Sequence, residues 1–196
     1  MSDDLNIKLI VGSTRPNRFS EHAAAWLHGV LKDTPGAELE LLDLRDYALP
    51  FYEEPASPAS DEKAGHDKEA VRRWSEKISE ADGFVVVAPE YNRGYSAVLK
   101  NAFDYVWYPW NRKPIAFLSY GNTGGARAVE QMRLVSIELE MVPIRRSVHV
   151  MEPWNLRDDG GVLKAGALDA YEKSARAMYE DLLWHARALK HARAAK

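Results

Sequence analysis

Short apolar runs alternate with longer amphipathic stretches along the chain, and this pattern predicts alternating strands and helices. The runs at 7–11, 39–44, 84–87, 115–118 and 147–150 are short and apolar enough to be buried strands. Apolar residues at helical spacing predict helices that begin at Ala23, His66, just after Ser96, at Gly124–Gly125 and near Leu168. Strands that alternate with helices favour right-handed crossovers. The expected fold is therefore an α/β, doubly wound parallel sheet.

Two of the predicted helices have a clear inner face. In the helix at 66–80 the inward residues are expected to be Val71, Trp74 and Ile78. The helix after Gly125 is expected to bury one stripe and to end at Pro143; the stripe consists of Val129, Met132, Leu134, Ile137 and Met141. The segment 45–65 contains Pro50, Pro55 and Pro58 and predicts a long loop of the kind that often covers a site.

Composition narrows the classes of function. The chain has 196 residues, of which 46% are hydrophobic and 28% charged, and it has no visible repeat or linker, which predicts one domain over 1–196. A net charge of −3 gives no reason to expect nucleic acid or an anionic membrane as partner. The absence of Cys excludes disulfides and thiol catalysis and is compatible with the cytoplasm, the predicted location. No signal peptide or membrane-length apolar run is visible, and the six His residues lack metal-ligand spacing, so no metal site is expected.

Three polar, glycine-containing loops follow the first, third and fourth predicted strands. Ligands of open α/β sheets bind at the carboxyl ends of strands, so these loops form the candidate site. The loop 12–20 has hydroxyls, two arginines and a following helix N-terminus; it is either a monophosphate site or a polar turn with solvated arginines. In the second loop Pro89 ends the strand, Gly94 is expected to allow a tight turn and Ser96 to cap a helix. The third loop, 119–125, is weak evidence alone, although its glycines permit close approach to a flat ring.

These loops also carry a family resemblance. Pro89-Glu-Tyr-Asn92, followed by Leu99-Lys-Asn-Ala102 and Asp104-Tyr105, resembles the signature of the NAD(P)H-dependent FMN reductases, which include quinone, azo-dye and chromate reductases. Gly12-Ser-Thr-Arg15 and Gly121-Asn-Thr-Gly-Gly125 resemble the other ligand loops of that family, and the match covers roughly residues 6–150 in the expected order. The resemblance implies a flavodoxin-like sheet of five strands in the order 2-1-3-4-5 with helices on both faces.

The resemblance also assigns residues to an FMN site. Ser13, Arg15 and Ser20 of the first loop would hold the phosphate, and Arg18 and Phe19 of the same loop would also belong to the cofactor site. Some relatives carry Ser at the position of Arg18 and Asn at that of Ser20, so these two positions depart from the pattern. Residues of the other loops would border the flavin: Pro89, Glu90, Tyr91, Asn92, Ser119, Tyr120 and Gly121. No catalytic side chain is implied, because the flavin carries the chemistry, and Glu90 is interpreted as a loop-stabilising group rather than as an acid or base.

The implied activity is hydride transfer from NADPH or NADH through bound FMN to a small electron acceptor such as a quinone, an azo compound or free flavin. Two alternatives are a flavodoxin-like electron carrier, against which the modest net charge argues, and an FMN- or nucleotide-binding module without redox activity. The resemblance further implies a homodimer or homotetramer. The aromatic cluster of Trp107, Tyr108 and Trp110 is expected to form part of that interface or to line the substrate pocket.

Overall fold

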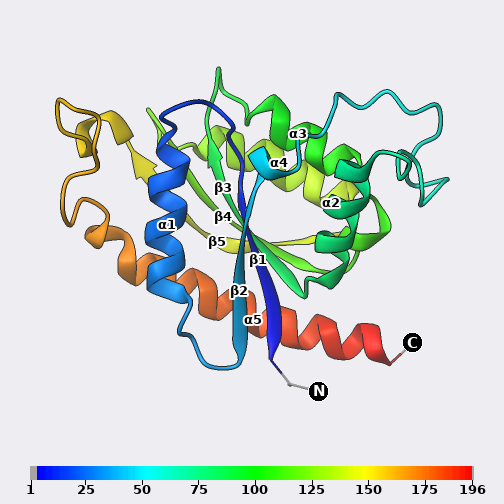
Figure 1. Cartoon of the computed structure of the whole chain (residues 1–196). Helices are drawn as coiled ribbons and strands as arrows, with labels where there is room; N and C mark the ends of the chain where they lie inside the picture. The colour runs from blue at the N-terminus through cyan, green and yellow to red at the C-terminus, as the bar shows by residue number, and fades with distance from the viewer. Residues whose placement is uncertain (1–3, 196) are drawn as a thin grey trace.

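The computed structural model describes residues 4–195 and contains one five-stranded parallel sheet with the strand order β2-β1-β3-β4-β5 (Figure 1). The strands are β1 (Leu5–Val11), β2 (Ala37–Asp43), β3 (Gly83–Pro89), β4 (Pro114–Gly121) and β5 (Val142–Met151). The predicted fold class and strand order are therefore confirmed.

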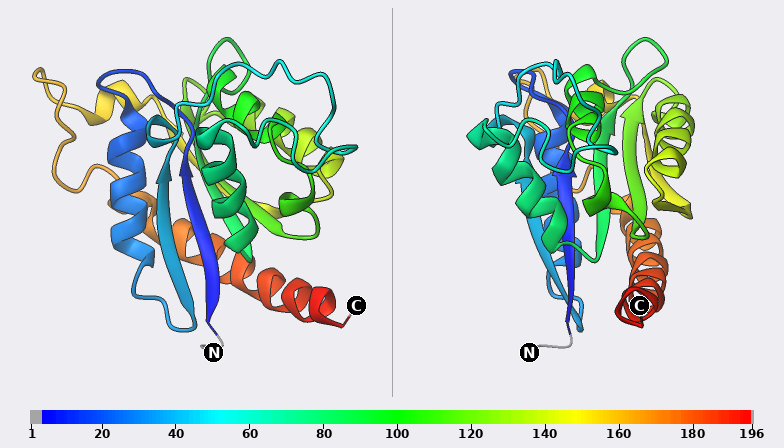
Figure 2. Two further views of the ribbon diagram at one scale, coloured as in Figure 1. Left: turned by 45° about the vertical axis from the view of Figure 1, so that its right-hand side comes forward. Right: turned by 90° about the vertical axis from the view of Figure 1, so that its right-hand side faces the viewer.

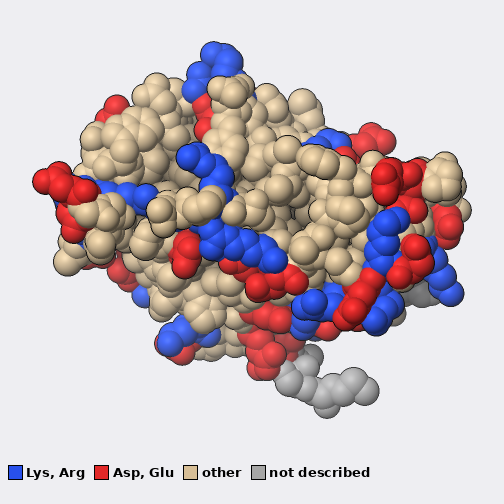
Figure 3. All heavy atoms as spheres, turned by 45° about the horizontal axis from the view of Figure 1, so that its top comes forward, with Lys and Arg blue, Asp and Glu red and all other residues tan. Residues whose placement is uncertain are grey.

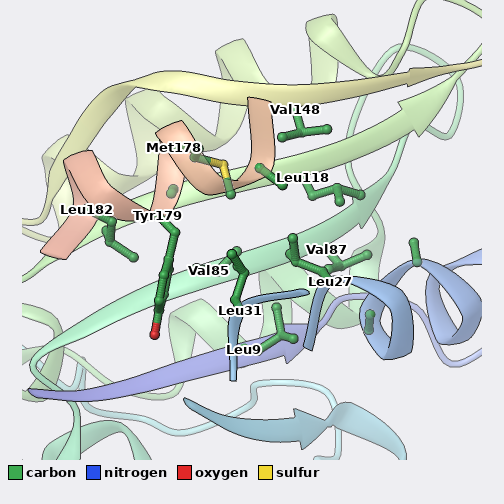
Figure 4. Close-up of a cluster of buried hydrophobic side chains, with 14 of the residues drawn as sticks. Leu9, Leu27, Leu31, Val85, Val87, Leu118, Val148, Met178, Tyr179 and Leu182 are labelled. Carbon is green, nitrogen blue, oxygen red and sulfur yellow. The ribbon is translucent and has the colours of Figure 1, made fainter. Parts of the chain in front are cut away.

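Helices cover both faces of the sheet. They are α1 (Phe19–Leu31), α2 (Glu69–Glu80), α3 (Ala97–Asp104), α4 (Ala126–Glu138) and α5 (Glu172–Ala194), with 3₁₀ turns at Leu44–Asp46, Tyr108–Trp110, Pro153–Leu156 and Asp169–Tyr171. One apolar core lies between the sheet and α1 and α5, and a second lies between the sheet and α2, α3 and α4. Figure 4 shows part of the first core, where Val85 and Val87 of β3 face Leu27 of α1.

The alternation of β3 explains why the sheet has a core on each side. Val85 and Val87 belong to the first core, whereas Phe84 and Val86 belong to the second, and all four side chains are fully buried. A strand buried on both faces needs a continuous apolar sequence, because polar side chains would be desolvated on either side. The carboxyl ends of β1, β3 and β4 therefore meet at one edge, where the three candidate loops begin.

Several predicted boundaries were wrong: α2 begins at Glu69 rather than at His66, α4 ends at Glu138 rather than at Pro143, and α1 and β5 begin earlier than expected. Helix α1 begins at Phe19 rather than at Ala23, because Arg18 is the last residue with extended backbone and the apolar face already starts at Phe19. Strand β5 begins at Val142, not at 147, and includes Pro143. Proline is tolerated there because β5 is an edge strand of the sheet.

The predicted stripe of α4 was correct only in part. Val129 and Met132 are buried, but Leu134 is 70% exposed and Ile137 is 62% exposed. The inner face of α4 instead includes Ser136, whose hydroxyl donates a hydrogen bond of 2.7 Å to the Met132 carbonyl oxygen. A buried serine that is satisfied within its own helix can replace an apolar residue, so the stripe lies farther round the helix than the apolar pattern suggests.

Trp110 is a core residue, which corrects the expectation for the aromatic cluster. Its ring is fully buried and makes edge-to-face contacts with Phe84, Phe103 and Trp74 at centroid distances of 4.7, 5.4 and 6.1 Å. Tyr108, in contrast, is half exposed and Trp107 is partly buried. The prediction that Trp110 belongs to an interface or a pocket wall is therefore wrong.

Two long loops extend from opposite sides of the molecule (Figures 1 and 2). One loop, 45–68, is held by the side-chain amide of Asn101 in α3. The amide oxygen accepts a hydrogen bond of 2.9 Å from the Tyr52 N–H, and the amide nitrogen donates one of 2.6 Å to the Pro50 carbonyl oxygen. The other loop, 152–168, follows β5 and lies beside the N-terminus of α1. Between 4 and 195 no helix is long and apolar enough to span a bilayer.

Candidate functional site

The three predicted loops converge on one cleft of about 480 Å³ at the carboxyl edge of the sheet. Residues 15–19, 90–91 and 120–121 form one side of the cleft, and residues of the loop after β5, between 153 and 161, form the other. Of the predicted site residues, the cleft is lined by Arg15, Arg18, Phe19, Glu90, Tyr91, Tyr120 and Gly121. The other predicted residues, Ser13, Ser20, Pro89, Asn92 and Ser119, lie behind or beside this lining.

Basic and acidic side chains are mixed around this edge of the molecule. Figure 3 shows Lys and Arg lying among Asp and Glu, without one continuous basic patch on the face in view. Among residues 4–195, no three or more His, Cys, Asp or Glu side chains are grouped so that they could hold a metal ion.

The first loop is tied to the second through Ser13. The buried Ser13 hydroxyl lies 2.9 Å from the Tyr91 hydroxyl and accepts a long, 3.5 Å hydrogen bond from the Arg15 N–H. The Arg15 guanidinium lies over the Tyr91 ring, with its Cζ atom 5.5 Å from the ring centre. These contacts hold the two loops together at the floor of the cleft, and the exposed Arg15 side chain remains accessible to a ligand.

Arg18 has a different partner from the one that the resemblance implies. Its guanidinium forms a two-pronged ion pair with Asp43 at the end of β2, in which the Nη1–Oδ1 distance is 2.8 Å, and it also donates to the Ser13 carbonyl. Burial raises the pKa of Asp43, but the hydrogen bond and charge of Arg18 outweigh that effect, so the pKa is lowered overall. Arg18 thus fixes the backbone of the first loop, and most of its donors are already used.

Phe19 and Ser20 begin α1 and pack against Tyr120 of the third loop. The Phe19 and Tyr120 rings meet edge to face at 5.0 Å, and Ser20 is fully buried beside them. Burial raises the pKa of Tyr120 to about 12, against smaller lowering effects from Ser20 and Arg18. The Tyr120 phenol is therefore neutral near pH 7 and presents a hydrogen-bonding group, not a charge, to the cleft.

Glu90 joins the second loop to the third. Its carboxylate accepts hydrogen bonds from the Arg127 guanidinium and, at 3.2 Å, from the Arg127 N–H, and its own N–H donates to the Tyr120 carbonyl at 2.9 Å. Burial raises the pKa of Glu90, but the hydrogen bonds and charge of Arg127 lower it overall. Glu90 is held as a carboxylate at the N-terminus of α4, which confirms its interpretation as a loop-stabilising group.

The turn after Glu90 is a type I′ hairpin. Tyr91 and Gly94 exchange two backbone hydrogen bonds of 2.7 and 3.0 Å, and Asn92 and Arg93 between them have φ values of 49° and 72°. The expectation that Gly94 would supply the turn is therefore wrong, because the left-handed positions are Asn92 and Arg93. Asn92 suits such a position, whereas arginine does not.

Replacing Arg93 with glycine is expected to raise the free energy of unfolding by up to about 1.5 kcal/mol. The substitution removes a left-handed penalty of about 1–2 kcal/mol and adds about 0.5–1 kcal/mol of chain entropy. Urea unfolding with matched m-values measures the difference. Arg72→Gly, at an exposed position at the end of the first turn of α2, is the opposite-sign control and should cost about 1 kcal/mol. A destabilised Arg93→Gly variant would show that the arginine side chain contributes more than its backbone costs.

Glycines of the third loop are needed for packing within the chain. A Cβ atom on Gly125 would lie 2.7 Å from the Ser119 Cβ atom, and one on Gly124 would lie 2.8 Å from the His149 Cβ atom. Both glycines also have φ values near the left-handed region, 64° and 75°. The buried Ser119 hydroxyl donates to the Gly124 carbonyl at 2.7 Å, so Ser119 and these glycines fix the loop on β4 and β5.

The loop after β5, which lines one side of the cleft, was not predicted from the sequence as part of the site. The loop after β5 contributes Trp154, whose large side chain is 55% exposed, and Arg157, whose Nη1 atom donates to the Asn17 carbonyl at 3.1 Å. The available signal was the position of this loop: β5 is parallel to the other strands, so its carboxyl end reaches the same edge as theirs.

These groups suit a flavin mononucleotide. The N-terminus of α1 has no side-chain cap and lies beside Arg15 and Arg157, which is a favourable place for a phosphate. Backbone and aromatic groups of 90–91 and 120–121 line the rest of the cleft, whose volume is within the range of small-ligand sites.

Comparison with known proteins agrees with this geometry. The family model of the NADPH-dependent FMN reductases matches residues 5–155. The chain is 41% identical over 138 residues to an NAD(P)H-dependent FMN reductase of a Nectria species, covering 69% of this chain and 68% of the relative. It is 32% identical over 146 residues to a 2-hydroxy-1,4-benzoquinone reductase of a Burkholderia species, covering 70% and 73%.

A solved structure supports the fold. FerB, a flavoenzyme NAD(P)H:(acceptor) oxidoreductase from Paracoccus denitrificans, superimposes with a TM-score of 0.71 over 92% of this chain and 98% of its own, at 21% identity. The sequence matches carry the assignment further than this structural likeness does: the chain belongs to the NADPH-dependent FMN reductase family, whose members are oxidoreductases that use FMN and NAD(P)H.

Proposed function

We propose that the protein oxidises NADPH or NADH and passes the reducing equivalents, through FMN held in the cleft, to a small acceptor such as a quinone, an azo compound or free flavin. The observation that carries the proposal is the convergence of three strand-end loops on one cleft, which Arg15 lines and which lies beside the uncapped N-terminus of α1. The quinone reductase among the relatives supports a small-molecule acceptor. FMN, when bound, supplies the hydride and electron chemistry.

The residues of the cleft position the cofactor and shield it. Arg15 and the N-terminus of α1 attract the phosphate, while the Ser13–Tyr91 and Glu90–Arg127 contacts keep the loops in place. The neutral Tyr120 phenol adds a hydrogen-bonding group without a charge that would oppose a reduced, negatively charged ring. No side chain is assigned a proton-transfer role, since Glu90 is held ionised by Arg127.

Anaerobic reduction tests this function. The purified protein is loaded with FMN, mixed with NADPH or NADH, and the bleaching of the flavin absorbance is followed. Reoxidation is then measured with a quinone, an azo dye and free FMN. We expect rapid bleaching by at least one nucleotide and reoxidation by a small acceptor. Reduction by dithionite but not by either nucleotide would instead indicate an electron carrier. A protein that stays colourless with added FMN would refute flavin binding.

We further propose that the protein is a homodimer or homotetramer with one domain per chain. Its proposed location is the cytoplasm. The outward-facing Leu134 and Ile137 of α4 form an apolar surface that a second copy could cover, which supports association. Static light scattering measures the mass, and a monomer at working concentrations would exclude the oligomer. The cytoplasm supplies the nicotinamide nucleotide that the reaction consumes.

A further inference from the structure

Arg157 reaches the N-terminus of α1 from the loop after β5. Its Nη1 atom donates to the Asn17 carbonyl at 3.1 Å, and its Cζ atom lies 5.6 Å from the centre of the Phe19 ring. Its Nε and Nη2 atoms are shut off from solvent and have no hydrogen-bond acceptor among the described residues. A charged guanidinium with two unpaired, buried nitrogens is costly, so an additional acceptor would stabilise this arrangement.

The other arginines of the cleft are engaged differently. Arg18 uses both Nη atoms on Asp43 and the Ser13 carbonyl, and its ion pair with Asp43 already neutralises its charge; only its buried Nε has no hydrogen bond, and that atom lies 3.8 Å from the Glu21 carboxylate. Arg15 is exposed and lies over the Tyr91 ring. Arg157 thus combines a fixed position beside the cleft with donors that the protein itself leaves unused.

The surroundings favour an anion with several acceptor oxygens. Arg157 lies beside an uncapped helix N-terminus, where the free N–H groups and the helix dipole attract negative charge. Asp158 and Asp159 also line the cleft, but one Asp158 oxygen is occupied by the Val162 N–H at 2.9 Å. A phosphate monoester can accept two parallel hydrogen bonds from the Nε and Nη2 atoms of a guanidinium whose Nη1 atom is held by Asn17, and a neutral sugar hydroxyl cannot match that charge.

We propose that Arg157 binds a phosphate monoester in the cleft and so sets the preference for phosphorylated over unphosphorylated ligand. The inference rests on the proposed function, and it concerns a residue beyond the region that the family model matches, which ends at 155. Two ligands could supply such a phosphate: FMN, at the end of its ribityl chain, and NADPH, at its ribose. In both cases the guanidinium recognises the same dianionic group.

Binding measurements separate the two sources. Apoprotein is titrated with FMN and with riboflavin, which lacks the phosphate, and the dissociation constants Kd are read from flavin fluorescence. We expect Arg157→Ala to reduce the preference for FMN over riboflavin about 10- to 100-fold, because a charge-assisted pair is lost. Arg157→Lys should retain part of the preference for FMN, since lysine keeps the positive charge but lacks the two parallel N–H donors of the guanidinium. Arg176→Ala, on the exposed side of α5, is the matched control and should leave both constants unchanged.

A second arm tests the nucleotide as the source. The FMN-loaded variants are assayed for KM with NADPH and with NADH. Loss of the NADPH-over-NADH preference with an unaltered FMN-to-riboflavin ratio would assign Arg157 to the NADPH phosphate. If Arg157→Ala and Arg157→Lys weaken FMN and riboflavin equally and leave the nucleotide preference unchanged, the proposal is overturned and Arg157 only supports the loop. The flavin titration needs no turnover, so it stays informative even if neither nucleotide reduces the flavin.

Discussion

Replacing Arg18 with alanine is expected to lower the free energy of unfolding by about 3 kcal/mol, the lower end of the range for removing one partner of a buried ion pair. The Arg18 side chain is only 2% exposed and that of Asp43 is 20% exposed, so the carboxylate would lose its charged partner in a poorly solvated place. The Ser13 carbonyl would lose a donor as well. Urea unfolding at pH 7 measures the loss, and FMN affinity is measured on the folded fraction.

The pH dependence separates the ion pair from other causes. The pKa of Asp43 is lowered in the folded protein by Arg18, so the pair stabilises the fold above the ordinary carboxyl pKa of about 4. This stabilisation is lost as the pH falls through the lower, folded value. The difference in the free energy of unfolding between wild type and Arg18→Ala should therefore become smaller in acid.

The paired replacement Arg18→Met with Asp43→Leu should lower the free energy of unfolding less than Arg18→Ala alone, because no charge is left unpaired. Unchanged stability together with a large loss of FMN affinity would instead make Arg18 a direct phosphate ligand.

Trp110→Ala is expected to destabilise the protein by about 3–5 kcal/mol, as for other large aromatic residues truncated in a core. The ring packs among Phe84, Phe103 and Trp74, so its removal leaves a cavity that these rigid neighbours fill poorly. Trp184→Ala removes the same side chain from a position that is 65% exposed, and it should cost under about 1 kcal/mol. Thermal or urea unfolding of both variants gives the comparison. A Trp110→Ala variant of normal stability but altered oligomeric mass would contradict the core assignment.

The sequence predicts the alternation of strands and helices well, because a strand buried on both faces and an amphipathic helix leave different apolar periods. It does not reveal which strand lies at the edge of a sheet, so the pattern predicts Pro143 before the last strand and not within it. It also does not show that the Ser136 hydroxyl can be satisfied within α4, so the apolar pattern wrongly predicts Leu134 and Ile137 on the buried face. Both errors concern tertiary context that local pattern does not contain.

For the candidate site, too, some features could be predicted from the sequence and others could not. The convergence of three loops could be predicted, because parallel strands place their carboxyl ends at one edge. The hydrogen-bond and ion-pair partners of the site residues could not be predicted. Asp43 follows Arg18 by 25 residues and Arg157 follows Asn17 by 140, and nothing in the local sequence connects either pair. Gly124 and Gly125 were recognised as loop residues, but the clash with Ser119 and His149 that requires them is visible only in three dimensions.

The hydrogen bonds that join Ser13 to Tyr91 and Glu90 to Arg127 have a kinetic consequence. They are formed in the protein's own structure, so flavin capture does not have to wait while separate segments become ordered. The association rate should then be governed by diffusion and orientation, and substitutions around the cleft should change mainly the residence time of the cofactor. A protein in which both contacts are intact would rebind FMN quickly after each dissociation, even when free FMN is scarce.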